Sequence, residues 1–341
     1  CVGAWALSAA AVNDNTALGW YALKDFTGSD ATAVGSGAAQ NAGSQADITA
    51  VGYQSLHRAT SGNSNTAIGA YCLDHTIDGT NNTGVGLMAL SADCVSNNVG
   101  VGYNSLAVFT GSNATAVGSG AADSATTADG ITAVGISALQ ALNHADGDNN
   151  TAIGAWSSDA LEGASSAGHS NTAVGAYSFS ASVDGSQNVA VGKSALHSGD
   201  CVDNNTAVGF EALKAFTGSN ATVVGSGAAD AAGSQTNLTA VGRNALGAAT
   251  SGNNNTAVGV STLQTVDGTE NTALGVAALG SDCVSNNTAV GYGALNAFTG
   301  SDATAVGSYA ADAVTSGAAN ITAVGRAALG AAVSGNNNTA V

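Results

Sequence analysis

The chain of 341 residues contains no proline, and charged and aromatic residues make up only 9% and 5% of it. This composition is unlike that of a typical enzyme domain. A charged disordered chain is also excluded, because valine, isoleucine and leucine recur at fixed places. Six Lys and Arg residues stand against 23 Asp and Glu residues, which gives a formal net charge of −17. We therefore expect no binding to nucleic acid or to anionic membrane surfaces.

Long hydrophobic runs are absent as well. No apolar run reaches the roughly 18 residues that a membrane span needs. The nearest candidate, residues 1–12, has no basic residues before its apolar part and follows the repeat described next. We therefore interpret it as part of the folded repeat rather than as a signal peptide. We expect no membrane insertion.

What the chain has in abundance is a repeat built on the pentad Asn-Thr-Ala-Val-Gly. We number each unit from the first residue of its pentad, which is position 1, and most units start 16 or 17 residues after the one before. The starts are Asn15, Ala31, Ile48, Asn65, Asn82, Asn98, Ala114, Ile131, Asn150, Asn171, Asn188, Asn205, Ala221, Leu238, Asn255, Asn271, Asn287, Ala303, Ile321 and Asn338.

The columns of this repeat predict an all-β fold. Position 2 is threonine except at Val99 and Val189, position 4 is always Val, Ile or Leu, and position 9 is usually leucine. Position 5 is glycine, as at Gly19, Gly35, Gly52 and Gly69. Because Thr-Ala-Val alternates with period two, we predict a parallel β-solenoid whose coils each contain a short strand, a turning glycine, a second short strand around Ala-Leu and a polar turn.

Phenylalanine and alanine columns indicate that consecutive coils touch. Four units carry alanine in place of the leucine at position 9, and each preceding unit carries phenylalanine at position 12. The phenylalanines are Phe26, Phe109, Phe216 and Phe298. We expect each ring to fill the space that the missing leucine leaves in the next coil, because protein interiors tolerate few voids.

Units also group into larger blocks. Residues 15–39 align with residues 205–229, which divides the chain into a partial coil 1–14 and the blocks 15–97, 98–204, 205–286 and 287–341. Since we see no polar caps, we expect a single repeat solenoid over 1–341 that is an excerpt of a longer array or a protomer that stacks end to end.

The pentads at 65–69 and 171–175 resemble the head repeats of trimeric autotransporter adhesins and the Asn-Thr-Ala-Val-Gly arrays of phage tail fibres. The resemblance implies a left-handed β-roll, three copies side by side, and a place outside the cell, on the cell surface or on a virion. Trimerisation is also expected because we expect the alanine at position 3 and the Ala-Leu pair to offer more apolar surface than one thin coil can bury.

Cysteines and histidines give no clear chemical site. Cys94, Cys201 and Cys283 lie in the same turn but too many coils apart to pair within one chain, so they are free thiols or bridge chains around a threefold axis. Cys72 occupies a column of small residues and is expected to pack. Only His57 and His75 lie at similar places on adjacent coils, and metal-ligand spacing is absent. Without a catalytic motif, we expect no enzyme, no cofactor and no metal.

Two ligand-binding interpretations remain weaker. Asn-rich turns such as 251–255 lack the calcium-binding roll pattern, so we expect asparagine side chains that hydrogen-bond between coils. The threonine column at position 2 suggests an ice-binding face as a hypothesis. The valines at 99 and 189 in the same column favour a half-buried β position instead.

An insertion at 159–170 is the most distinctive locus. If one place contacts a cell-surface receptor or glycan, Trp156, Asp159, Glu162 and His169 are the candidates, and a tolerated surface loop is the simpler interpretation. The sequence thus predicts a fibrous structural protein that partners with itself as a homotrimer and has adhesion as a further role. A filament or sheath polymerising end to end is the alternative, and an ice-binding or other ligand-binding solenoid is a third.

Overall fold

The computed structural model describes the whole chain except residues 143–146, 162–167, 183, 201, 315–317 and 331–333. Contacts group the chain into two compact units, Cys1–Asn171 and Thr172–Val341. The boundary follows position 1 of one coil and lies inside the block 98–204.

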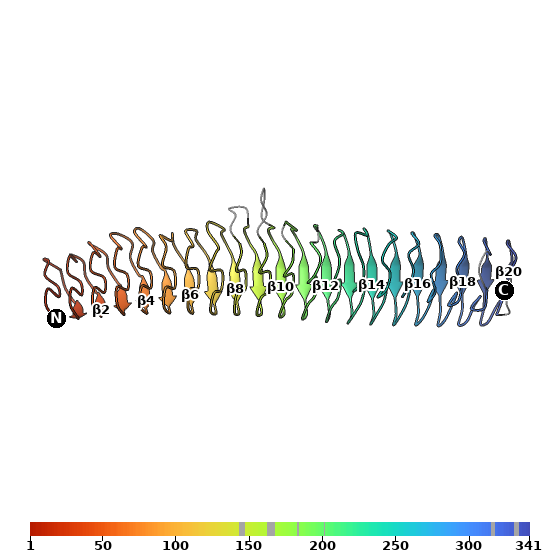
Figure 1. Cartoon of the computed structure of the whole chain (residues 1–341), viewed down its shortest axis with the longest axis horizontal. Coiled ribbons are helices and arrows are strands. Elements are labelled where there is room, and N and C mark those ends of the chain that lie inside the picture. The colour runs from red at the N-terminus through yellow and green to blue at the C-terminus, as the bar shows by residue number, and fades with distance from the viewer. Residues whose placement is uncertain (143–146, 162–167, 183, 201, 315–317, 331–333) are drawn as a thin grey trace. The chain divides into compact units, whose positions relative to one another are not determined.

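From residue 15 onward, each coil contributes one short strand formed by positions 2 to 4 of the repeat, or by positions 2 and 3 in the last (Figure 1). The strands of the first unit are β1 (Thr16–Leu18), β2 (Thr32–Val34), β3 (Thr49–Val51), β4 (Thr66–Ile68), β5 (Thr83–Val85), β6 (Val99–Val101), β7 (Thr115–Val117), β8 (Thr132–Val134) and β9 (Thr151–Ile153). Those of the second are β10 (Thr172–Val174), β11 (Val189–Val191), β12 (Thr206–Val208), β13 (Thr222–Val224), β14 (Thr239–Val241), β15 (Thr256–Val258), β16 (Thr272–Leu274), β17 (Thr288–Val290), β18 (Thr304–Val306), β19 (Thr322–Val324) and β20 (Thr339–Ala340).

Within each unit, consecutive strands pair in parallel and in register. Thr16 lies opposite Thr32 and Leu18 lies opposite Val34, and the same pairing of equal positions recurs along both units. The chain is therefore an all-β parallel solenoid, and the expected contact between consecutive coils is confirmed.

The glycine at position 5 turns the chain out of each strand. These glycines have φ between 123° and 147°, where other residues are strained. A Cβ on Gly118 would also collide with the backbone carbonyl of Gly135 in the next coil. Both roles expected for this glycine, a turn and a close approach, are confirmed.

The predicted second strand around Ala-Leu is wrong. Position 9 is left-handed, with φ of 52° at both Leu23 and Leu106, and position 7 is left-handed as well. A strand cannot continue through such residues, so this part of each described coil is a series of turns. Coils still bond to each other here, as Leu23 N–H donates to the Ala38 carbonyl at 3.0 Å.

The core lies inside each coil. In β1 to β19 the central residue, usually alanine, is buried, and the position 9 leucines from Leu23 to Leu295 are at most 1% exposed. A Cβ on Gly100 would lie 3.0 Å from Leu90 Cγ, so position 3 packs against the leucine of the preceding coil. One chain therefore buries its Ala and Leu columns alone, and the expectation that these columns need a second protomer is wrong.

The four phenylalanine rings are fully buried, and so are the alanines Ala39, Ala122, Ala229 and Ala311 at position 9 of the following coils. Each ring tip also faces a glycine two residues later. A Cβ on Gly28 would lie 2.8 Å from Phe26 Cζ, and Gly111, Gly218 and Gly300 are in the same situation. The Phe-Thr-Gly tripeptide is therefore one packing unit, because only glycine leaves room for the ring.

Candidate interaction surface

An outward apolar column follows the strands of each unit. Because side chains alternate along a strand, burying position 3 turns positions 2 and 4 outward. Position 4 carries only valine, isoleucine or leucine and is half-buried to exposed, with Leu18 at 47% and Leu274 at 49%. We call this ladder of position 4 side chains the apolar stripe.

Large apolar side chains also stand just beyond the turning glycine, at position 6. The exposed ones are Trp20, Tyr53, Leu87, Tyr103 and Ile136 in the first unit and Phe210, Val276 and Tyr292 in the second. Some of these rings contact the next coil edge to face, at 5.3 Å between the centroids of Tyr53 and Tyr71 and 5.1 Å between those of Tyr292 and Tyr309. Position 6 therefore adds half-exposed aromatic area near the apolar stripe.

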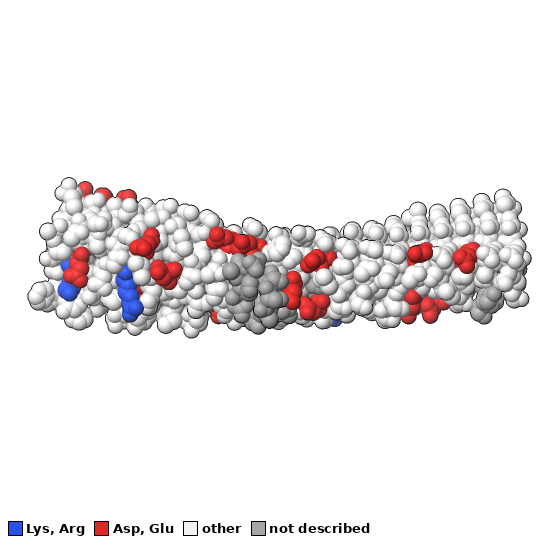
Figure 2. All heavy atoms as spheres, turned by 90° about the horizontal axis from the view of Figure 1, so that it is seen from above, with Lys and Arg blue, Asp and Glu red and all other residues white. Residues whose placement is uncertain are grey.

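Charge is absent from position 4 and sparse elsewhere. On the face shown in Figure 2, red acidic side chains form scattered groups, blue basic ones are few, and most of the surface carries no charge. The sequence predicts a half-buried threonine column at position 2, and the structure agrees only in part. The exposed threonines are Thr16, Thr32, Thr222, Thr272, Thr304, Thr322 and Thr339.

The predicted contact locus is described in part. Trp156 is 37% exposed in the turn after β9, Asp159 is half-buried, and His169 is exposed with Nδ1 at 3.2 Å from Ser170 Oγ. Glu162 lies outside the described residues. The structure therefore places Trp156 and His169 where a partner can reach them.

The two described turn cysteines are buried. Cys94 and Cys283 are each 1% exposed, and burial raises the pKa of both thiols, to about 11 for Cys283. Such burial favours the free-thiol alternative over a bridge between chains. Cys201 lies outside the described residues.

Cys72 is fully buried as well, and burial raises its pKa to about 12. In the next coil, Gly84 stands at position 3 in place of alanine, and a Cβ there would collide with Cys72 Sγ. The packing role predicted for Cys72 is confirmed, and Gly84 is its compensating partner.

Asparagines at position 1 form a buried ladder. Asn65 Oδ1 accepts a hydrogen bond from Asn82 N–H at 2.9 Å, and Asn65 Nδ2 donates to the Gly79 carbonyl at 2.7 Å, three residues before the next coil starts. Asn82 and Asn98 repeat both bonds.

The Asn-rich turn at 251–255 follows the same principle. Oδ1 of Asn253, Asn254 and Asn255 each accepts a hydrogen bond from a neighbouring coil, at 2.9 Å in all three cases. The predicted hydrogen bonding between coils is confirmed.

His57 and His75, which the sequence places on adjacent coils, lie on either side of Asp74. Their Nδ1 atoms are each 3.3 Å from an Asp74 carboxylate oxygen. Sequence reasoning missed Asp74, although the Asp-His pair at 74–75 was a signal that could have found it. No group of three or more His, Cys, Asp or Glu side chains arranged to hold a metal occurs within the described ranges.

No helix among the residues that the structure describes has the length and apolar character needed to cross a membrane. No family model, no curated protein and no solved structure matches this chain.

Proposed function

We propose that the chain is a fibrous structural protein, extracellular or on a virion, that forms a rigid homotrimeric shaft of left-handed β-solenoids. Adhesion to a surface receptor or glycan is a further role, with the exposed Trp156 and His169 as contact candidates. The observation that carries the proposal is the apolar stripe. Its side chains carry no charge and are half-buried to exposed along the strands of each unit.

An exposed apolar ladder of this length supports contact with another protein surface. A second copy of the chain presents the same ladder, and in-register strands space its side chains at about 4.8 Å, so two ladders can pack along their length. Closed rotational symmetry would bury the stripe of every copy around one axis. The resemblance of the pentads to trimeric adhesin heads and tail fibres favours three copies.

The test is the mass of the assembly formed by the full chain, measured by sedimentation equilibrium. We expect a trimer for the unchanged chain and a folded monomer for the Val117→Asp, Leu274→Asp double variant, because it places like charges around the axis in both units. Ala248→Asp, at an exposed site away from position 4, is the matched control and should leave the trimer intact.

A monomeric unchanged chain would overturn the proposal. A mass that grows without limit as concentration rises would instead support the alternative, a filament or sheath that polymerises end to end. Circular dichroism of each variant establishes that a change in mass does not reflect unfolding.

A further inference from the structure

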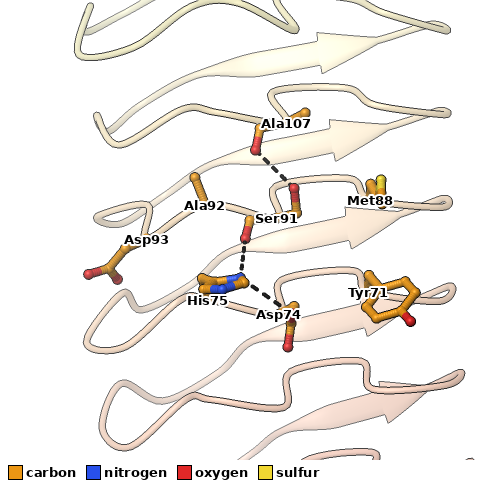
Figure 3. A pocket seen from close by; sticks show the side chains of 8 residues that line it. All are labelled: Tyr71, Asp74, His75, Met88, Ser91, Ala92, Asp93 and Ala107. Carbon is orange, nitrogen blue, oxygen red and sulfur yellow. Dashed lines mark hydrogen bonds and ion pairs between the residues drawn. The ribbon is translucent and has the colours of Figure 1, made fainter.

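A surface hollow of about 460 Å³ opens on the first unit, across the turns that follow β4, β5 and β6. Figure 3 shows Tyr71 and Met88 on one side, His75 and Asp93 on the other, and Asp74 and Ser91 between them. Its volume is in the range of small-molecule sites, which combine apolar walls with a few polar groups.

The carboxylate of Asp74 is the unusual group in this hollow. Its side chain is 10% exposed. Oδ1 is fully buried on the side of His57, whose Nδ1 lies 3.3 Å away, and accepts no hydrogen bond from the residues that the structure describes. The oxygen that a group in the hollow can meet is therefore Oδ2. Buried polar atoms normally have hydrogen-bond partners, and a buried charge needs a counter-charge.

The second carboxylate oxygen is only partly satisfied. His75 Nδ1 lies 3.3 Å from Asp74 Oδ2 and 3.1 Å from the Ser91 carbonyl oxygen. A nitrogen that faces two acceptors carries a hydrogen, and here this one hydrogen is shared between them. The Ser91 hydroxyl donates to the Ala107 carbonyl at 2.9 Å and is therefore engaged elsewhere. A positively charged donor in the hollow would give Oδ2 a hydrogen bond and balance the charge of the carboxylate.

The side chains that line the hollow indicate which kind of molecule would carry this positively charged donor. The Tyr71 ring and the Met88 side chain offer an apolar side, and an aromatic face also attracts a cation. Asp93, which is exposed, adds a second negative charge at the opposite side. The combination fits a positive group on a small apolar body.

The chain contains its own comparison for this hollow. In the aligned block 205–286, the positions of Tyr71, Asp74, His75 and Met88 are taken by Ser261, Gln264, Thr265 and Ala277, and that of His57 by Gly247. The repeat backbone therefore does not require these side chains, and they occur together at one place.

From the hollow, its buried carboxylate and its apolar wall, we infer that this site binds a small organic primary amine in its ammonium form. The ammonium group donates to Asp74, and the apolar body lies against Tyr71 and Met88. This inference goes beyond the proposed function and does not depend on trimerisation.

The experiment is calorimetric titration of the full chain with phenethylammonium chloride, beside its uncharged analogue 2-phenylethanol. We expect the ammonium compound to bind at least tenfold more tightly than the alcohol. Asp74→Asn should weaken ammonium binding at least tenfold. The Asp74→Asn, Gln264→Asp variant restores the net charge at the matching repeat position and should stay as weak, which separates a site from general attraction to an acidic chain.

Ala107→Phe provides a second variant that leaves His57, Asp74 and His75 unchanged and fills the hollow. It should abolish binding while the melting temperature stays within a few degrees of that of the unchanged chain. Equal binding of amine and alcohol, or full binding by Ala107→Phe, would overturn the inference. No detectable binding of the amine would also overturn the inference. The contacts of Asp74 with His57 and His75 would then serve only to link neighbouring coils.

Discussion

At the scale of the residue, backbone conformation decides which aliphatic side chain stands where. Position 9 has φ near 50°, where a branched Cβ is strained, and it carries leucine but never valine or isoleucine. Position 4 lies in a strand and carries mostly valine. The two columns are therefore set by φ as well as by burial.

This difference can be tested at Leu106, which is fully buried with φ of 52°. Leu106→Ile should cost about 2 to 3 kcal/mol, because a β-branched side chain is more strained than leucine at this φ and the change of shape adds to that strain. Leu106→Met keeps an unbranched Cβ and should cost less than about 1.5 kcal/mol. Native-state hydrogen exchange of amides in coil 98–113 measures both, and equal costs would contradict the explanation.

At the scale of the element, the coil depends on its turning glycine. Gly225→Ala should destabilise coil 221–237 by at least about 3 kcal/mol, because φ is 147° and the new Cβ would meet the Gly242 carbonyl. Gly233→Ala in the same coil is the control. Its Cβ would lie 3.4 Å from the nearest atom, the Thr250 carbonyl oxygen, and we expect a change within about 1 kcal/mol.

Thermal denaturation followed by circular dichroism compares the two glycine variants directly. A Gly225→Ala variant as stable as Gly233→Ala would show that the coil relaxes around the added methyl group. The role assigned to position 5 would then be wrong.

The same element shows how far the sequence predicts this fold. The period of Thr-Ala-Val predicted each strand, and the glycine column predicted each turn. The second strand was wrongly predicted because residues such as Leu23 have positive φ, which the apolar character of the Ala-Leu pair does not reveal. The signal that could have shown it is the absence of valine and isoleucine from position 9.

The candidate surface was harder to predict. Hydrophobicity alone would place Val117 in the core and the smaller Ala116 on the surface. The structure reverses this, because position 3 faces the leucine of the preceding coil and has room only for a small side chain. Asp74 was missed because the expected adjacency of His57 and His75 was not combined with the Asp-His pair at 74–75, which places a carboxylate between them.

At the scale of the whole molecule, charge opposes association. Each copy carries a formal charge of −17, so copies packed side by side repel one another. Salt shortens the Debye length from about 10 Å at 0.1 M to about 3 Å at 1 M. The apolar stripe contains no ion pairs for salt to weaken.

We therefore expect added salt to strengthen self-association. Sedimentation equilibrium across this range of sodium chloride should show the trimer persisting to at least tenfold lower protein concentration at the high-salt end. Association that weakens with salt would show instead that ion pairs hold the copies together, and the stripe would lose its assigned role.

The asparagine ladder has a consequence for how such a chain changes length. A ladder asparagine such as Asn82 accepts a hydrogen bond from the first residue of the next coil, Asn98, and donates to the carbonyl of Val95, three residues before it. A gene that loses or duplicates one whole repeat joins an old asparagine to a new coil start of the same geometry, and every bond is remade. Coil 150–170 shows that extra residues between the pentad and the last three residues of a coil leave both bonds in place. The array can therefore change length by whole coils or inside the turns, but a change that shifts a pentad relative to the three residues before it breaks the ladder.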